Sequence, residues 1–519
     1  MAAARVAGGI FITRILGFIR ERAMAHYLGT SLAADAFRAA LRIPNVLRNL
    51  LGEGTLSASF IPVYTALEQR GDRAAARALA GTVLGILLAA SGLLAVLGIA
   101  LAPAITTTVA AGFDEPTRRL TITLVRLLFP MTGLMVVSAW CLGVLTSHDR
   151  FFLPYVAPAL WNIAGIVALV AAATWIVAPD APLEVRLHQL ALALAWGTVA
   201  GSVLQVAVQF PSCWRIVSGG AGGVPLRLSL VPEGARDVVR AWTPLVLGAG
   251  VGQISALIDT QLGSFAGAGA VASLGYAQLL GQLPVSLFGV AVAAAALPAL
   301  SRDAAAGEQG AVAAALRDRL ADGFGRIAFF VVPSAFAFVA LGDDLVALLF
   351  QTGRFGSTDT AIVGKVLAAY GIGLLGMATV KLFASGFYAQ RDTRTPVRFS
   401  IVTLVVSTGT AVALLPHMGP VGIALGSSVG ALVNLVLQLS TLERRLGRVL
   451  EREDWRALLT TVAASLAGCG AWWLAQGRLL AAGPVVGGLA AIAIFGVTYL
   501  VITLILGHPE ARQLWTRLR

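Results

Sequence analysis

The sequence has little charge for its length. Only 12% of its 519 residues are Asp, Glu, Lys or Arg, whereas a soluble domain carries roughly 25%. This scarcity excludes the charged surface that a soluble globular protein needs, so most of the surface must face lipid. Hydrophobic residues make up 57% of the chain, the mean hydropathy is +0.83, and apolar runs recur from end to end. A single anchor on a soluble domain is therefore excluded as well.

Cysteine, histidine and the common catalytic motifs are scarce. The three cysteines, Cys141, Cys213 and Cys469, have no spacing typical of a metal site or of a disulfide framework. The sequence contains no H-E-x-x-H pair, no nucleophile elbow, no P-loop and no intramembrane carboxylates spaced for a metal. We therefore predict a chain that is not an enzyme, needs no cofactor and has no ATPase of its own.

Long apolar segments take the place of these motifs. A helix that crosses the hydrocarbon core needs about 20 residues, and backbone groups at that depth must be paired internally, which favours helices. The short alternating segments of a membrane β-barrel are not seen. We predict an all-α polytopic membrane protein of about fourteen transmembrane helices, at roughly 5–28, 33–64, 75–103, 118–147, 150–177, 188–211, 236–265, 268–300, 322–349, 360–388, 396–416, 419–442, 455–475 and 482–507.

Lysine is nearly absent, since the chain has 36 arginines and only two lysines, Lys365 and Lys381. If the N- and C-termini are both cytoplasmic, the inner loops carry most of the loop arginines, as the positive-inside rule requires. The net charge of +12 then reflects topology, so nucleic acid is not expected as a partner. The outer loops hold few basic residues, namely Arg118, Arg119, Arg186, Arg354, Lys365 and Arg478.

The two halves of the chain resemble each other. A proline ends a helix before a charged loop in 60–62 and again in 296–298, and the loop 147–154 has an echo in 390–396. These offsets, about 236 to 242 residues, predict two six-helix lobes related by a pseudo-two-fold axis along the membrane normal. The predicted parts are an N-lobe at 1–211, a cytoplasmic linker at 212–235, a C-lobe at 236–445 and two further helices at 455–507.

Charged residues inside the first two predicted helices are the most informative feature. Each costs several kcal/mol at the bilayer centre unless it meets water or a partner. Asp35, Arg38 and Arg42 lie at helical spacing and share one stripe. Arginine binds phosphate oxygens through two parallel N–H groups, so the pattern predicts a cationic cavity for a phosphate-bearing cargo. The alternative is that these charges pair among themselves or extend to the membrane surface. The residues concerned are Arg14, Arg20, Glu21, Asp35, Arg38, Arg42, Arg48 and Glu53.

Two other intramembrane charges stand apart from this group. Arg126, in the fourth predicted helix, either lines the same cavity or caps a partner. Asp259, in the seventh, either binds a cation or proton or hydrogen-bonds to Gln253, Gln261 or the backbone.

One family matches these residues in order. The stretches 13–21, 35–37 and 44–48, followed by Glu53 and Gly54, resemble the MurJ/MviN family. That family comprises bacterial lipid II flippases of the multidrug/oligosaccharidyl-lipid/polysaccharide exporter superfamily. Phe129-Pro130, Gly353-Arg354-Phe355 and Thr395-Pro396-Val397 extend the resemblance over most of the chain.

The resemblance implies a multi-pass protein of the bacterial inner membrane that serves peptidoglycan biosynthesis and cell shape. Such a protein flips lipid II to the periplasmic leaflet by alternating access, among membrane lipids and with cell-wall synthesis proteins as possible partners. Arg14, Arg20 and Arg48 match the cavity arginines that hold the diphosphate. The acidic positions match at Asp35 and Glu53, Glu21 replaces an Asp, Arg42 matches a basic position, and Arg38 lies outside the pattern.

Two departures from the family pattern bear on cargo and coupling. The eighth helix lacks the usual arginine and has Leu279 in this region, so Arg38 and Arg126 become candidates to replace it. Asp259 matches one sodium ligand of some members, but Ala411 and Leu415 stand near the other ligand positions. Membrane potential is therefore the alternative to Na⁺ as the driving force. The competing functions are a flippase for another polyprenyl-diphosphate glycan, a cation-coupled multidrug exporter and a non-transporting scaffold.

Overall fold

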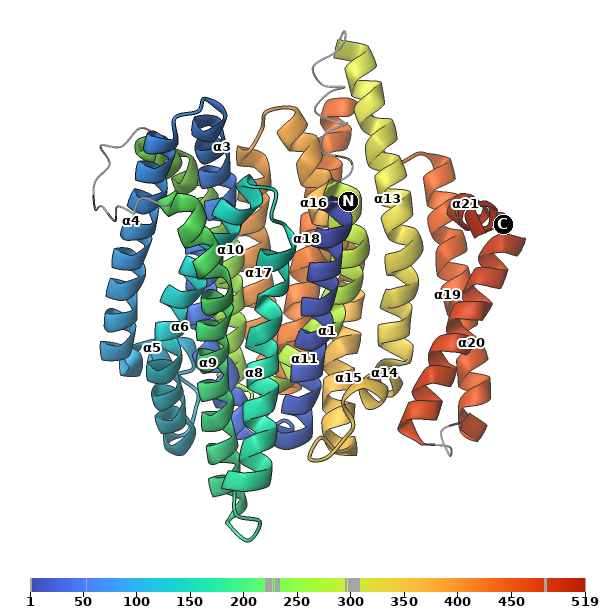
Figure 1. Ribbon diagram of the computed structural model, residues 1–519. Coiled ribbons are helices and arrows are strands. Elements are labelled where there is room, and N and C mark those ends of the chain that lie inside the picture. The colour runs from blue at the N-terminus through green and yellow to red at the C-terminus, as the bar shows by residue number, and fades with distance from the viewer. Residues whose placement is uncertain are drawn as a thin grey trace. The chain divides into compact units, whose positions relative to one another are not determined.

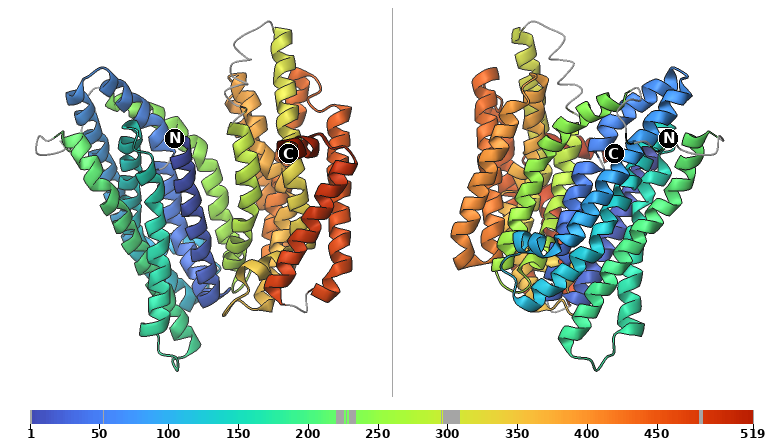
Figure 2. Two further views of the ribbon diagram at one scale, coloured as in Figure 1. Left: turned by 45° about the vertical axis from the view of Figure 1, so that its right-hand side comes forward. Right: turned by 90° about the vertical axis from the view of Figure 1, so that its left-hand side faces the viewer.

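A computed structural model of the chain describes residues 2–52, 54–219, 234–294, 309–479 and 483–518, together with 226, 228 and 296. Every regular element among these residues is a helix, which confirms the predicted all-α class. The helices form two compact units, residues 1–271 and 272–519. Within each unit the long helices run side by side and are joined by short turns (Figures 1 and 2).

The first unit contains α1 (Ala2–Leu28), α2 (Leu32–Leu51), α3 (Thr55–Gln69), α4 (Arg73–Ala100), α5 (Ala102–Val109), α6 (Glu115–Ser147), α7 (Phe152–Val156), α8 (Pro158–Ala171), the π-helix η1 (Ala172–Ile176), α9 (Leu183–Ser218) and α10 (Ala235–Phe265). α11 (Ala270–Pro284) begins at the boundary between the units. The second unit continues with the π-helix η2 (Val285–Val290), α13 (Gln309–Ala340), α14 (Gly342–Phe350), α15 (Ser357–Ile372), α16 (Leu374–Ala389), α17 (Arg394–Met418), α18 (Pro420–Leu446), α19 (Arg452–Leu479), α20 (Pro484–Ile505) and α21 (Pro509–Leu518).

Ten helices among the described residues are long and apolar enough to cross a membrane, or eleven if the bent pair α15–α16 is one span. The chain is therefore a multi-pass membrane protein. The three other predicted spans correspond to α1, to α2 with α3, and to α10, which are helical too, and the count of fourteen stays a prediction. The predicted helix 33–64 is not continuous. α2 ends at Leu51 and α3 begins at Thr55, because Gly54 takes a φ of 87° that L-residues rarely adopt.

Two turns support the internal repeat. Asp149 and Arg391 both have a left-handed backbone, with φ of 57° and 60°, although neither is glycine. In the first turn Arg150 donates its backbone N–H to Leu145, and in the second Asp392 donates to Phe387. The same hydrogen bond thus recurs at the same offset in both halves. The other echo is not supported in the same way. Pro62 lies inside α3, which continues to Gln69, so the prediction that this proline ends a helix was wrong, and 296–298 lies largely outside the described residues.

Helix α10 packs against α2, α3 and α5 of the first unit. Its end is held by the turn after α5, where the backbone N–H of Gly112 donates to Ser264 Oγ at 3.0 Å. A Cβ at Gly112 would lie 2.6 Å from the backbone of Ser264, so only glycine permits this approach. The internal repeat predicts that this helix belongs to the C-lobe. The lobe boundaries at 211 and 236 stay predictions, since repeat and packing are different properties.

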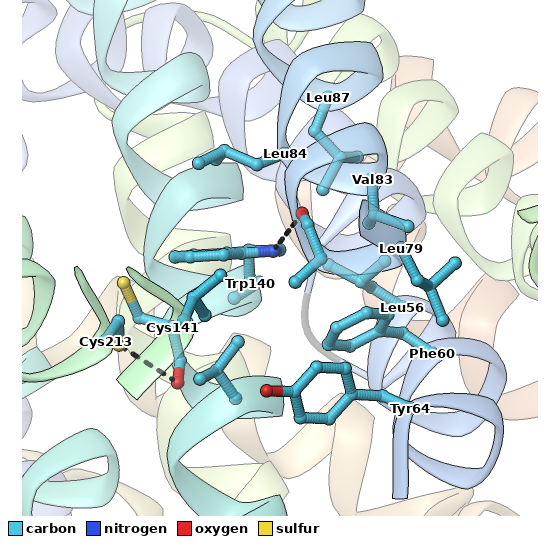
Figure 3. Packing of buried hydrophobic residues seen from close by; sticks show 14 of the residues in the cluster. Leu56, Phe60, Tyr64, Leu79, Val83, Leu84, Leu87, Trp140, Cys141 and Cys213 are labelled. Carbon is cyan, nitrogen blue, oxygen red and sulfur yellow. Dashed lines mark hydrogen bonds between the residues drawn. The ribbon is translucent and has the colours of Figure 1, made fainter. Parts of the chain in front are cut away.

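The apolar core of the first unit gathers around Trp140 of α6 (Figure 3). Its indole is fully buried among side chains of α4, including Val83 and Leu84, and its Nε1–H donates to the carbonyl oxygen of Ala80 at 3.1 Å. This one side chain therefore combines apolar burial with a satisfied polar group, which is how a buried Trp stabilises a helix bundle.

Replacing Trp140 with alanine is expected to lower the free energy of unfolding by about 3–5 kcal/mol, the usual cost of deleting a buried aromatic ring. Thermal unfolding of the purified protein in detergent measures the effect as a lower midpoint. Trp196→Ala is the matched control, because Trp196 is 62% exposed on α9. Equal midpoints for the two variants would contradict the assigned core.

The last helix, α21, has only ten residues and lies crosswise to its neighbours in the second unit (Figure 1). Buried His508 holds its first turn. Imidazole Nδ1 accepts the backbone N–H of Glu510 at 3.2 Å, so the ring proton must lie on Nε2. Nε2–H then donates to Thr461 Oγ1 at 3.1 Å. The hydroxyl of Thr461 in turn donates to the carbonyl oxygen of Ala457.

Docking of α21 is expected to depend on pH. Burial lowers the pKa of His508 below its ordinary value. The stability that neutral His508 contributes is therefore fully present above the ordinary imidazole pKa of about 6.5, and it is lost as the pH falls through the lower folded value. Hydrogen exchange of residues 509–516 should speed up on acidification in the wild type. The exposed His417 provides the control, because His417→Asn should leave this response unchanged; a pH-independent exchange rate would contradict the anchoring role.

Candidate functional site

The predicted site begins with two helices that the local sequence delimits clearly. α1 ends at Leu28, directly before Gly29, which has a φ of 59°. Ser31 then caps α2, its Oγ accepting the backbone N–H of Ala34 at 3.3 Å. α2 continues through Pro44 to Leu51. Five of the predicted arginines lie on these two helices.

Glu21 joins the two helices. Its Oε1 accepts Arg20 Nη2 at 2.7 Å, and its Oε2 accepts Arg38 Nη2 at 2.6 Å. All three side chains are largely buried, with 11–16% of each exposed. One carboxylate thus holds two guanidiniums from different helices, and this trio carries a net charge of +1. The alternative that these charges pair among themselves is realised here, but one arginine remains in excess.

Arg20 is also held from α8, which the sequence analysis did not foresee. Its guanidinium carbon lies 4.2 Å from the ring centroid of Trp161, within the range of a cation–π contact. Gly165, one turn further along α8, also lies beside Arg20, since an added Cβ would be in ordinary van der Waals contact with Arg20 Cδ at 3.5 Å. Trp161 therefore helps to position Arg20 without adding a charge. This contact depends on tertiary packing and could not be predicted from the sequence.

Arg48 differs from Arg20 and Arg38 in having no such partner. No hydrogen bond or ion pair of its guanidinium is formed within the described chain, and its buried Nε is unsatisfied. The buried Oδ1 of Asn45, three residues earlier on α2, is unsatisfied as well. A half-buried guanidinium without a counter-charge is costly in an apolar setting, so Arg48 is disposed to bind an anion.

The rest of the α2 stripe faces α10. Arg42 Nε donates to Thr260 Oγ1 at 2.9 Å, and Asn49 Nδ2 donates to Gln253 Oε1 at 3.2 Å. Asp259 precedes Thr260 on α10, so the Arg42 side chain reaches this part of the helix. The structure therefore brings the stripe and the seventh predicted helix together, and it places a guanidinium near the acid that the sequence analysis considered for a cation.

Asp35 has a different setting from the arginines. It is fully buried, and its Oδ2 accepts the backbone N–H of Gly269 at 2.6 Å. Gly269 has a φ of 80°, and a Cβ there would meet the carbonyl oxygen of Thr30 at 2.2 Å. Asp35 thus fixes the turn between α10 and α11 to the start of α2, which is a positioning role.

The remaining predicted residues lie on α1, α6 and α11 or outside the described residues. Arg14 lies on the exposed side of α1. Arg126 is exposed on α6 and forms no hydrogen bond or ion pair within the described chain. Glu53 lies outside the described residues. Leu279 lies on α11, at the position where the family usually has an arginine. Among the residues described, no group of three or more His, Cys, Asp or Glu side chains is arranged to hold a metal.

Comparisons with known proteins agree on one family. A family model described as "Lipid II flippase MurJ" matches residues 24–494. The lipid II flippase MurJ of Burkholderia cenocepacia is 35% identical over 447 residues, which cover 85% of this chain and 83% of that protein. A probable lipid II flippase MurJ of Rhizobium meliloti is 33% identical over 442 residues, covering 85% and 79%.

Solved structures share the fold. The structure titled "Lipid II flippase MurJ, inward closed conformation" aligns with a TM-score of 0.79 and 22% identity, covering 96% of this chain and 98% of that one. An inward-facing multidrug resistance MATE family transporter of the MOP superfamily aligns with a TM-score of 0.66 and 15% identity, covering 86% and 99%.

Proposed function

Because this chain belongs to the MurJ family of lipid II flippases, we propose that it carries lipid II from the cytoplasmic to the periplasmic leaflet of the bacterial inner membrane. The cargo is a muropeptide joined to a polyprenyl chain through a diphosphate. Transport of such a lipid requires a protein that shields the polar head and the phosphate charge from the hydrocarbon core, since a bare charge there is very costly.

The observation that carries the assignment of the site is the arginine group of α1 and α2. Arg20 and Arg38 are fixed by Glu21 at 2.7 and 2.6 Å, and Arg48 has no counter-charge in the described chain. Guanidiniums that are already oriented lose little conformational entropy when they bind phosphate oxygens. We assign the diphosphate to Arg20, Arg38 and Arg48, with Arg14 and Arg42 as further cations and Arg126 and Glu53 as further candidates.

We propose that Arg38 compensates for the arginine that is missing at Leu279. The family's arginine in the eighth helix is missing here, and Arg38 is an arginine that the family pattern lacks. Its ion pair with Glu21 places it in the same group as Arg20. Arg38 therefore replaces, from α2, the positive charge that other members supply from the eighth helix.

Coupling follows from the same charges. Arg42 donates to Thr260, the residue next to Asp259, at 2.9 Å, and a guanidinium in this position disfavours a bound sodium ion beside that carboxylate. We propose that the membrane potential resets the empty carrier, since it acts directly on a net positive group in the membrane, at about 2.3 kcal/mol per charge per 100 mV. Both termini lie in the cytoplasm in this scheme, because the arginine-rich loops lie on that side.

A second candidate is a flippase for another polyprenyl-diphosphate glycan. Leu279 favours it, because the change lies where the family usually contributes to cargo binding. The diphosphate would meet the same arginines, and only the sugar head would differ. A multidrug exporter is less suitable despite the shared fold, since an excess of buried arginine repels a cationic drug.

Complementation tests the proposal. Expression of this chain in a bacterium depleted of its own lipid II flippase is expected to restore growth and rod shape. Immunoblotting of membranes confirms that the protein is present at a normal level. If the chain is well expressed in a compatible host and the cells still lyse, lipid II is not its cargo, and the second candidate takes precedence.

A further inference from the structure

The second unit contains two adjoining cavities that the arginine group of α1 and α2 does not involve. The first, of about 180 Å³, lies between η2, α13 and α21. The second, of about 350 Å³, lies along α13 toward its N-terminal end. Val292 and Arg326 line both. From this geometry we propose that the cavities bind the headgroup region of a zwitterionic aminophospholipid, one with an ethanolamine headgroup.

One wall of the site is apolar. Phe288 of η2 stacks on Phe330 of α13, with ring centroids 4.3 Å apart and an interplanar angle of 6°. Val292 and Leu514 extend this wall. The π-helical turns of η2 widen that segment, a geometry often found at binding sites. Such a wall fits the first carbons of acyl chains, which enter from the lipid beside the helices.

The other wall carries alternating charges. Arg319, Asp322 and Arg326 lie on one stripe of α13 at i, i+3 and i+7. In the first cavity, a carboxylate oxygen of Glu510 of α21 lies 3.7 Å from Arg326 Nε. The first cavity thus has the Arg326–Glu510 ion pair on its lining, and the second has Arg319, Asp322 and Arg326. A purely anionic headgroup would be repelled by the carboxylates and a purely cationic amphiphile by the guanidiniums, whereas a headgroup with both a phosphate and an ammonium satisfies both pairs.

The depth of the site suits a headgroup. α20 ends its span at Ile505, and Glu510 follows after one short turn. The ion pair with Glu510 thus places Arg326 at the end of a membrane span, where the hydrocarbon gives way to the polar region. α21 has the length and the exposed Trp515 of a helix that lies in this interface.

Ethanolamine is favoured over choline by hydrogen bonding. Its ammonium has three N–H donors for the carboxylates of Asp322 and Glu510, whereas a quaternary choline has none. The arginines take the phosphate. This site is independent of the proposed transport function, since it involves other residues and a resident membrane lipid.

Native mass spectrometry of the full-length protein tests the proposal. The protein is released from nanodiscs that contain equal parts of phosphatidylethanolamine, phosphatidylcholine and phosphatidylglycerol with matched acyl chains. We expect one phosphatidylethanolamine to be retained in preference to the other two by about tenfold, the effect of one charge-assisted hydrogen bond. Arg326→Ala and Glu510→Gln are expected to remove this preference. Arg456→Ala, an exposed arginine on α19, serves as the control and should keep it.

A second variant is needed because Arg326→Ala also removes the ion pair that holds α21 to α13. Val292→Trp fills the space that both cavities share and leaves every charge in place, so it is expected to abolish retention of phosphatidylethanolamine. Equal retention of the three lipids by the wild type would overturn the proposal, because the site would then recognise acyl chains only. Retention of phosphatidylethanolamine by Val292→Trp at the wild-type level would overturn it as well.

Discussion

Cells that depend on the Arg48→Ala variant for lipid II transport are expected not to grow, although the variant reaches the membrane at a normal level. Arg48 has no counter-charge within the described chain, so its removal breaks none of the ion pairs among the described residues, and we expect the variant to fold. It does remove a guanidinium that can hold two phosphate oxygens at once. A charge-assisted hydrogen bond is worth about 1.5–3 kcal/mol, which corresponds to a roughly ten- to hundredfold loss in transport.

Two further variants sharpen this test. Arg48→Lys keeps the charge but loses the two-pronged geometry, and is expected to support slow growth. Arg119→Ala is the matched control, because Arg119 is an exposed arginine of the same unit whose ion pair among the described residues is with nearby Glu115. Depleted cells that grow normally on Arg48→Ala would show that this arginine does not bind the cargo.

Replacing Glu21 with glutamine is expected to lower both the membrane level and the growth rescue, although the site becomes more positive. The change leaves Arg20 and Arg38 close together in a largely buried setting without their shared carboxylate. Removal of one partner from a buried ion pair costs about 3–5 kcal/mol. Glu21→Asp keeps the charge and, with a shorter reach, is expected to retain part of the activity.

A double variant separates the structural role of Glu21 from the binding role of Arg38. In Glu21→Gln with Arg38→Gln the net charge of the group returns from +2 to +1, carried by Arg20 alone, so the protein level is expected to recover in part. Growth rescue is expected to stay absent, because Arg38 supplies a charge that the cargo needs. Full rescue by the double variant would reduce Arg38 to a partner of Glu21 and leave the loss at Leu279 uncompensated.

The sequence was sufficient to predict where the helices and the charges lie. Apolar length defined most spans, and helical spacing placed Asp35, Arg38 and Arg42 on one stripe. Spacing could not show which neighbour each residue of the stripe meets. In the structure Arg38 turns to Glu21 of α1, Arg42 to Thr260 of α10, and Asp35 to the turn at Gly269. These choices depend on tertiary packing.

Other parts of the site carry no signal in the sequence. Trp161 is one aromatic residue among many in an apolar helix, and its role appears only when Arg20 lies against its ring. α21 was missed because ten residues are too few for a span, and its docking depends on His508, a single buried ring. Gly52 and Gly54 indicated a bend or a break between α2 and α3, but 33–64 was still predicted as one span because apolar residues continue on both sides of Gly54.

The most direct measurement is the movement of lipid II itself across vesicle membranes that contain the purified chain. Lipid II is placed in one leaflet, a membrane potential is imposed, and its arrival in the other leaflet is followed over time. We expect the wild type to move lipid II much faster than protein-free vesicles do, and Arg48→Ala to be close to the protein-free rate. A wild-type protein that is folded and correctly inserted, yet moves lipid II no faster than empty vesicles, would contradict the proposed function.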